Sequence, residues 1–180
     1  MIRTVTLGFS SDPIARWLWP ETDVYLSAMP IFIEHFTGSA FEHETALVTD
    51  NYRAAALWLR PDASANDDAI DALLDATVSR NQADDTQSFF GQMAAFHPHE
   101  QPCWYLPMIA TDPAHQGCGI GSVLIERALQ RCDAESLPAY LEASSPRSVP
   151  LYERHGFAVI GEIQAGSSPV MYPMLREAAW

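Results

Sequence analysis

Three glycines, Gly117, Gly119 and Gly121, stand close together directly before a stretch with the spacing of a helix. Glycine lets the backbone approach a ligand closely and turn where other residues would be strained. The first amide groups of a helix have no partner inside the helix and lie at the positive end of its dipole. Backbone amides in this arrangement bind phosphate groups, so the sequence predicts an anion-binding loop here.

A buried strand and an amphipathic helix must hold this loop. Residues 104–111 are apolar on both faces, which predicts a buried strand. After the loop, apolar residues recur at helical spacing from Ile120 to Cys132, with Glu126 and Arg127 on the opposite face. Pro107 has no amide hydrogen, so it predicts a bulge or an unpaired position in the strand.

The spacing of the glycines separates three kinds of phosphate site. A P-loop needs Gly-Lys-Ser/Thr, and this chain contains no lysine. A dinucleotide-binding loop needs G-x-G-x-x-G, a spacing that the glycines do not have. The pattern Q/R-x-x-G-x-G/A is met by Gln116, Gly119 and Gly121. In this pattern the chain resembles the GNAT N-acetyltransferase superfamily, in which the loop binds the pyrophosphate of coenzyme A. An ordinary strand-to-helix turn is the alternative for the loop taken alone.

A second motif strengthens the resemblance. Residues 151–157, Leu-Tyr-Glu-Arg-His-Gly-Phe, are similar to the Y-E-K/R-x-G-F segment that ends a helix in GNAT enzymes. Residues 55–59 and 169–174 are similar to the third and last strands of the family, and the resemblance is weakest over residues 61–103. Within the family, the chain is most similar to the puromycin-acetyltransferase-like branch of bacterial small-molecule acetyltransferases.

The resemblance implies an α/β (α+β) fold, with one GNAT domain over residues 1–180. Its central sheet would be mixed, mostly antiparallel, of about seven strands, flanked by helices and with the fourth and fifth strands splayed apart. Alternating apolar residues predict a first strand at residues 2–9, and Asp12 with Pro13 predicts the start of a helix. The remaining predicted strands are 41–49, 53–59, 104–111, 138–143, 157–163 and 170–175. Further helices are predicted over 12–19, 22–37, 67–80, 84–96 and from about Ser148 to His155.

The resemblance also implies which residues bind acetyl-CoA. The thioester would enter between the splayed strands, where the amides of Ile109 and Thr111 would face the ligand, one of them stabilising the oxyanion. Ser148 stands where the family often has an asparagine that bonds the coenzyme, so this contact is missing or water-mediated. The full predicted cofactor-binding set is Ile109, Ala110, Thr111, Gln116, Gly117, Cys118, Gly119, Ile120, Gly121, Ser122 and Ser148.

Two residues are candidates for proton transfer. Glu142 is the one acid in the apolar strand 138–143, where burial would raise its pKa toward that of a useful base. The alternative is a structural acid paired with an arginine or a backbone amide. Tyr152 corresponds to the family tyrosine that protonates the departing thiolate, with a core tyrosine as the alternative.

Other chemistry is disfavoured. His97, His99 and Glu100 lie in a proline-rich loop and are more simply explained as solvated side chains, so no metal is expected. Cys103, Cys118 and Cys132 lack metal-site spacing, and their odd number predicts free thiols in a reducing cytosol. The sequence places no base beside Cys103 or Cys118, so direct acetyl transfer without a covalent intermediate is expected.

Composition limits the partners. The formal net charge of −13 disfavours nucleic acid, and it suits a cationic substrate but is also common in soluble proteins. No segment has the length of a signal peptide or a membrane span, so a cytoplasmic protein is expected.

These features predict an acetyl-CoA-dependent N-acetyltransferase acting on a primary amine of a small molecule. The alternatives are a protein or peptide N-acetyltransferase and a non-catalytic acyl-CoA-binding sensor. A homodimer is a further expectation from the resemblance.

Overall fold

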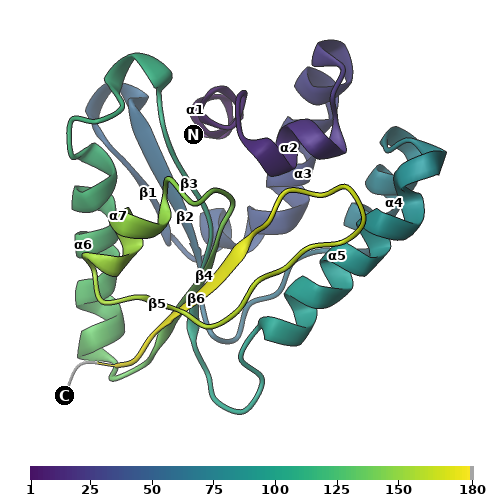
Figure 1. Cartoon of the computed structure of the whole chain (residues 1–180). Helices are drawn as coiled ribbons and strands as arrows, with labels where there is room; N and C mark the ends of the chain where they lie inside the picture. Colours follow the sequence, from purple (N-terminus) through teal and green to yellow (C-terminus); the bar gives the residue numbers. More distant parts are fainter. Residues whose placement is uncertain (179–180) are drawn as a thin grey trace.

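The computed structural model describes residues 1–178, and a six-stranded mixed sheet lies at its centre (Figure 1). The strands are β1 (Ala46–Val48), β2 (Ala54–Leu59), β3 (Trp104–Thr111), β4 (Ala139–Ala143), β5 (Ala158–Val159) and β6 (Tyr172–Arg176). Their order is β1-β2-β3-β4-β6-β5, and only the pair β3–β4 is parallel. The predicted fold class is confirmed, with six strands instead of seven. Residues 179 and 180 of the predicted domain lie outside the described residues.

Helices cover both faces of this sheet (Figure 1). They are α1 (Ile2–Gly8), α2 (Pro13–Leu18), α3 (Thr22–Glu42), α4 (Asp67–Thr77), α5 (Ala83–Phe96), α6 (Ile120–Ala134) and α7 (Val149–Glu153). Helices α1 to α5 pack on one face and α6 with α7 on the other, so the core has two apolar layers. Side chains of a strand alternate between these layers, as Leu57 and Trp58 of β2 do. None of the helices in residues 1–178 is long and apolar enough to cross a membrane.

The strand predicted at residues 2–9 is wrong, because this segment is helix α1. Val5 is fully buried, whereas Leu7 is 48% exposed, an arrangement that the predicted alternation does not give. A Cβ atom at Gly8 would lie 2.6 Å from Cβ of Ala110, so glycine allows α1 to pack closely on β3. A short run of apolar residues is compatible with both periods, and packing against β3 decides between them.

The irregularity predicted at Pro107 is present and separates two strands. The register of β2 against β3 shifts between Leu57 and Leu59, opposite Pro107. Strand β4 pairs with β3 only along Trp104–Leu106, so residues 107–111 of β3 are not paired with β4. The predicted splay between these two strands is therefore confirmed.

Several predicted boundaries differ from the observed ones. Helix α3 continues to Glu42 through Pro30, five residues beyond the predicted end at Thr37. The predicted strand 41–49 is consequently reduced to β1 (Ala46–Val48). Helix α4 ends at Thr77 instead of Arg80. The remaining elements are two short 3₁₀ turns, Asp50–Tyr52 and Arg80–Gln82, and a third one, Pro113–His115, in the glycine-rich loop.

Candidate active site

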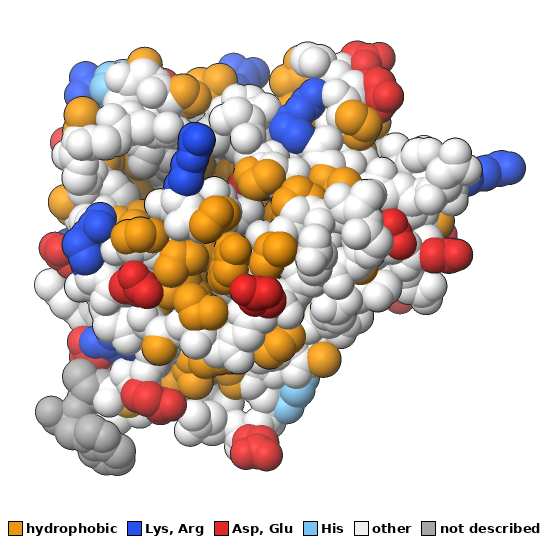
Figure 2. Space-filling view, in the orientation of Figure 1, with side chains coloured by type: hydrophobic (Ala, Val, Ile, Leu, Met, Phe, Trp, Pro, Cys, Tyr) orange, Lys and Arg blue, Asp and Glu red, His pale blue; other side chains and the backbone are white. Residues whose placement is uncertain are grey.

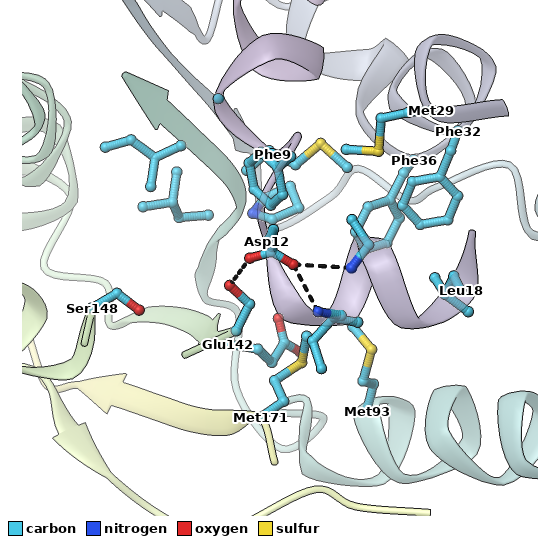
Figure 3. A pocket seen from close by; sticks show the side chains of 18 of the residues that line it. Phe9, Asp12, Leu18, Met29, Phe32, Phe36, Met93, Glu142, Ser148 and Met171 are labelled. Atoms are coloured by element: carbon cyan, nitrogen blue, oxygen red, sulfur yellow. Dashed lines mark hydrogen bonds between the residues drawn. The ribbon is translucent and has the colours of Figure 1, made fainter. Parts of the chain in front are cut away.

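A cavity of about 180 Å³ opens where β3 and β4 separate (Figure 3). The segment before α2, helices α3 and α5, both strands and α7 all contribute to its wall. In the orientation of Figure 1, apolar side chains gather in the middle of this face, between α7 and α5 (Figure 2). The cavity therefore connects the strand gap with an apolar region formed by the helices.

Glu142 is on β4 and lines this cavity. Burial raises the pKa of its carboxyl from 4.5 to about 7, and the hydroxyl of Tyr105 counteracts this shift by donating a 2.8 Å hydrogen bond to Oε2. Tyr140 and the backbone amide of Glu142 counteract the shift to a smaller extent, so the structural acid paired with a backbone amide stays the alternative to a base. A carboxyl that is half ionised near neutral pH can accept a proton from a substrate.

Tyr152 lies on α7 and borders the same cavity, with 7% of its surface exposed. Its ring is 6.2 Å from that of Phe157, so the apolar part of the side chain packs into the core layer beside α6. Burial, and secondly the charge of Asp12, raise the pKa of its hydroxyl. The hydroxyl is therefore protonated at neutral pH, which a proton donor requires.

The glycine-rich loop has the geometry that its composition predicts. Gly117 and Gly119 have φ angles of 75° and 79°, in the left-handed region, and Gly119 begins helix α6. A Cβ atom added at either position would meet no atom within 4 Å, so the space beside the loop is open. Gln116 Nε2 donates to the carbonyl of Thr111 at 3.3 Å, and His155 Nε2 lies 3.1 Å from Ser122 Oγ. These contacts hold the loop to β3 and to the end of α7.

The backbone of β3 has a free edge toward the gap. The amide of Asp112 donates to the carbonyl of Arg53 at 2.8 Å, so it points toward the β2 side. Because amide directions alternate along a strand, those of Ile109 and Thr111 point to the opposite side, where β4 has separated. Ala110 faces α1 instead, through its contact with Gly8.

The remaining residues of the predicted set have different surroundings. Ser148 lines the cavity just before α7, and its hydroxyl donates to the carbonyl of Ser145 at 2.8 Å. Cys118 is exposed on the glycine-rich loop. Within residues 1–178, no group of three or more His, Cys, Asp or Glu side chains is placed to bind a metal ion.

Three polar residues of the cavity were not predicted to belong to it: Asp12, Tyr105 and Ser144. Asp12 was expected only to begin a helix, and it does so, since Oδ1 accepts from the amides of Ile14 and Ala15 at 3.0 Å. Its other oxygen accepts a hydrogen bond from Ser144 Oγ (Figure 3). The helix-start pattern indicated the cap, but no local pattern places it beside β4.

Comparisons with known proteins bear on the family and the fold of the chain. The model of the acetyltransferase (GNAT) protein family matches residues 46–157. The chain is 27% identical over 133 residues to the peptidyl-lysine N-acetyltransferase YjaB of Escherichia coli, covering 68% of this chain and 86% of that protein. It is 23% identical over 167 residues to an uncharacterised N-acetyltransferase of Schizosaccharomyces pombe, covering 86% and 68%. A crystal structure described as histone acetyltransferase HPA2 and related acetyltransferase, from Corynebacterium glutamicum, superposes with a TM-score of 0.67 at 25% identity, over 99% of this chain and 90% of that one.

Proposed function

Because the chain belongs to the acetyltransferase (GNAT) family and is an acetyl-transferring enzyme, we propose that it acetylates a primary amine of a small molecule. Acetyl-CoA supplies the acetyl group as a thioester. The observation that carries the proposal is the cavity between β3 and β4, which joins Glu142 and Tyr152 to an apolar region of limited volume.

The glycine-rich loop and the end of β3 fit acetyl-CoA, the acetyl donor. The open space at Gly117 and Gly119 admits a pyrophosphate beside the first amides of α6, and the free edge of β3 offers amides to the pantetheine arm. We assign this role to the backbone of Ile109 to Thr111 and of Gln116 to Ser122. Ser148 borders the same gap, but its hydroxyl hydrogen is used by Ser145, so it serves the coenzyme at most as an acceptor.

Glu142 removes a proton from the bound ammonium group in this mechanism. An aliphatic amine has a pKa near that of lysine, about 10.4, so most of it is protonated at pH 7. The neutral amine nitrogen then attacks the thioester carbonyl, whose oxyanion is stabilised by an amide on the free edge of β3.

Tyr152 completes the proton balance. As the carbon–sulfur bond breaks, the sulfur of coenzyme A leaves as a thiolate, and the Tyr152 hydroxyl protonates it. The acetyl group is now bonded to the amine nitrogen, which loses its second proton through solvent to the Tyr152 phenolate, and the first proton taken from the ammonium group is on Glu142. Glu142 releases its proton to solvent, so both groups are restored, one proton is released overall, and no covalent enzyme intermediate is needed.

A lysine side chain of a protein is the second candidate acceptor. It is favoured by the similarity to a peptidyl-lysine acetyltransferase and to a structure described as a histone acetyltransferase. Against it, side chains of α2, α3 and α5 line the apolar end of the cavity, where an extended chain would have to lie. A small amine therefore remains our proposal.

An amine panel tests the proposal. Purified protein is mixed with acetyl-CoA and, separately, aromatic amines, polyamines, amino acids and lysine-containing peptides; free thiol and the acetylated product are measured. We expect turnover with a non-peptide amine. Turnover only with peptides would transfer the assignment to a protein acetyltransferase, and calorimetric binding of acetyl-CoA without any turnover would indicate a sensor.

A further inference from the structure

We propose that Asp12 binds the ammonium group of the acceptor, and that the acceptor is an amine with one aromatic or similarly compact apolar group and no carboxylate. This inference rests on the proposed acetyl transfer and specifies its substrate. Asp12 lies outside residues 46–157, so the family match does not include it.

The charges of the cavity wall are of one sign. Asp12 and Glu142 line the cavity, and no arginine or histidine is among the lining residues. Asp12 receives its hydrogen bonds from two backbone amides and one hydroxyl, all of them neutral. Within residues 1–178, no ion pair of Asp12 is formed. A partly buried carboxylate without a positive partner is costly, and a cationic ligand would supply that partner.

Asp12 is also in the right place relative to the predicted base. Its partner Ser144 follows Glu142 by two residues, and the three side chains share one part of the wall (Figure 3). Burial raises the pKa of Asp12, as it does that of Glu142, so both carboxyls gain from a positive charge between them. Asp12 can hold the ammonium while Glu142 removes its proton.

The other side chains of the cavity wall indicate which group the acceptor carries besides its amine. Phe9, Phe32, Phe36 and Phe90 line the cavity together with several methionines, and the rings of Phe32 and Phe36 are 5.2 Å apart. The acetyl group and the acceptor would share a volume of about 180 Å³, which leaves room for no more than one ring with a short chain, since an apolar cavity of about 150 Å³ accommodates benzene. With no cation in the wall, an acceptor carboxylate would be left buried and unpaired beside two acids.

Binding to protein saturated with coenzyme A tests this without requiring turnover. Calorimetry compares 2-phenylethylamine with L-phenylalanine, which adds only a carboxylate, and with 1,4-diaminobutane, which lacks the apolar group. We expect 2-phenylethylamine to bind at least tenfold more tightly than either. Asp12→Asn should weaken its binding at least tenfold, while affinity for coenzyme A is unchanged. Asparagine is as good a helix cap as aspartate, so the fold should persist, which the melting temperature checks.

Asp68→Asn is the matched control, because it removes one exposed carboxylate from the first turn of α4. It should leave the binding of 2-phenylethylamine unchanged. The inference is overturned if folded Asp12→Asn binds this amine like the wild type, if L-phenylalanine or the diamine binds equally well, or if no amine of the set binds. Since binding alone decides it, a lack of acetyl transfer would contradict the proposed function and not this assignment.

Discussion

Glu142 and Tyr105 form the polar pair at the point where the two central strands separate. The hydroxyl of Tyr105 is buried and donates to Glu142 Oε2, and burial, followed by the charge of Glu142, raises the pKa of this tyrosine. Tyr105 therefore remains a donor throughout the physiological pH range. The burial of the predicted base thus raises its pKa, and Tyr105, followed by Tyr140 and the backbone amide of Glu142, limits the rise.

Glu142→Gln should separate catalysis from stability. The wild-type carboxyl ionises at about pH 7 when folded and near 4.5 when unfolded, so the folded state loses stability as pH rises between these values. At pH 8 the variant should be more stable by up to about 3 kcal/mol, and this advantage should disappear at pH 4.5. Its turnover should fall by ~10²–10⁴ near pH 7 and recover toward the pKa of the amine. An unaltered pH–rate profile in the folded variant would exclude Glu142 as the base.

Tyr105→Phe should move the pH dependence without removing the base. Loss of the donated hydrogen bond raises the pKa of Glu142 above its value of about 7, so the rising limb of the pH–rate profile should shift to higher pH. Activity at high pH should approach that of the wild type, and acetyl-CoA affinity should not change. A uniform loss at every pH would instead indicate a packing defect.

Tyr152→Phe removes one hydroxyl and keeps the ring packed against Phe157. Turnover should decrease by ~10²–10⁴, the range of general acid catalysis, with little change in acetyl-CoA affinity. The loss should be smaller with a donor whose leaving thiol is less basic. Wild-type turnover in this variant would show that Tyr152 is only a core residue.

At the scale of elements, the glycine-rich loop is held between β3 and α6 by backbone conformation. Gly119 combines a φ of 79° with open space, so a side chain there fits sterically but carries the usual strain of about 1–2 kcal/mol. The same open space is the predicted position of the pyrophosphate. We therefore expect a side chain in this loop to affect binding more than folding.

Gly119→Asp should therefore abolish acetyl-CoA binding in calorimetry while circular dichroism remains native. The added carboxylate would repel the pyrophosphate and occupy its space. Gly91→Asp is the matched control, because a Cβ atom at this exposed helical glycine of α5 also meets nothing within 4 Å. Acetyl-CoA binding by a folded Gly119→Asp protein would contradict the loop assignment.

At the scale of the whole molecule, the segment between β5 and β6 joins helices that are distant in sequence. Trp17 Nε1 of α2 donates to Ser167 Oγ at 3.2 Å, and Gln92 Nε2 of α5 donates to the carbonyl of Gln164 at 2.9 Å. Gly166 lies between these contacts and packs against Asp85 of α5. This segment therefore fixes the helices whose side chains enclose the apolar end of the cavity.

Gly166→Ala tests that connection. Its φ of 51° strains a side chain, and the Cβ atom would lie 1.8 Å from Asp85 Oδ2, so Asp85 must move. We expect a loss of about 1–3 kcal/mol in denaturant unfolding and a raised KM for the amine. Acetyl-CoA affinity should be unchanged, because the glycine-rich loop belongs to the other side of the sheet. An equal loss of affinity for both substrates would contradict this division.

The sequence by itself determined the parts that depend on local conformation. Glycine spacing predicted the loop, Pro107 predicted the strand irregularity, and Asp12 with Pro13 predicted the start of α2. These features depend on backbone angles and amide hydrogens of neighbouring residues, which the residue types specify directly. The lone acid of a buried strand was likewise visible in the sequence, because the apolar residues around Glu142 predicted its burial.

Only the tertiary structure decided the parts that depend on distant contacts. Residues 2–8 are helical because they pack on β3, and their apolar spacing alone does not distinguish helix from strand. Asp12 reaches the cavity through Ser144, 132 positions away, and Tyr105 meets Glu142 across 37. Such pairs result from strand pairing and helix docking, which no local pattern encodes. Thus the backbone of the loop and of the strand end that we propose to face the coenzyme was largely predictable, whereas the residues proposed to select the acceptor were brought together by folding.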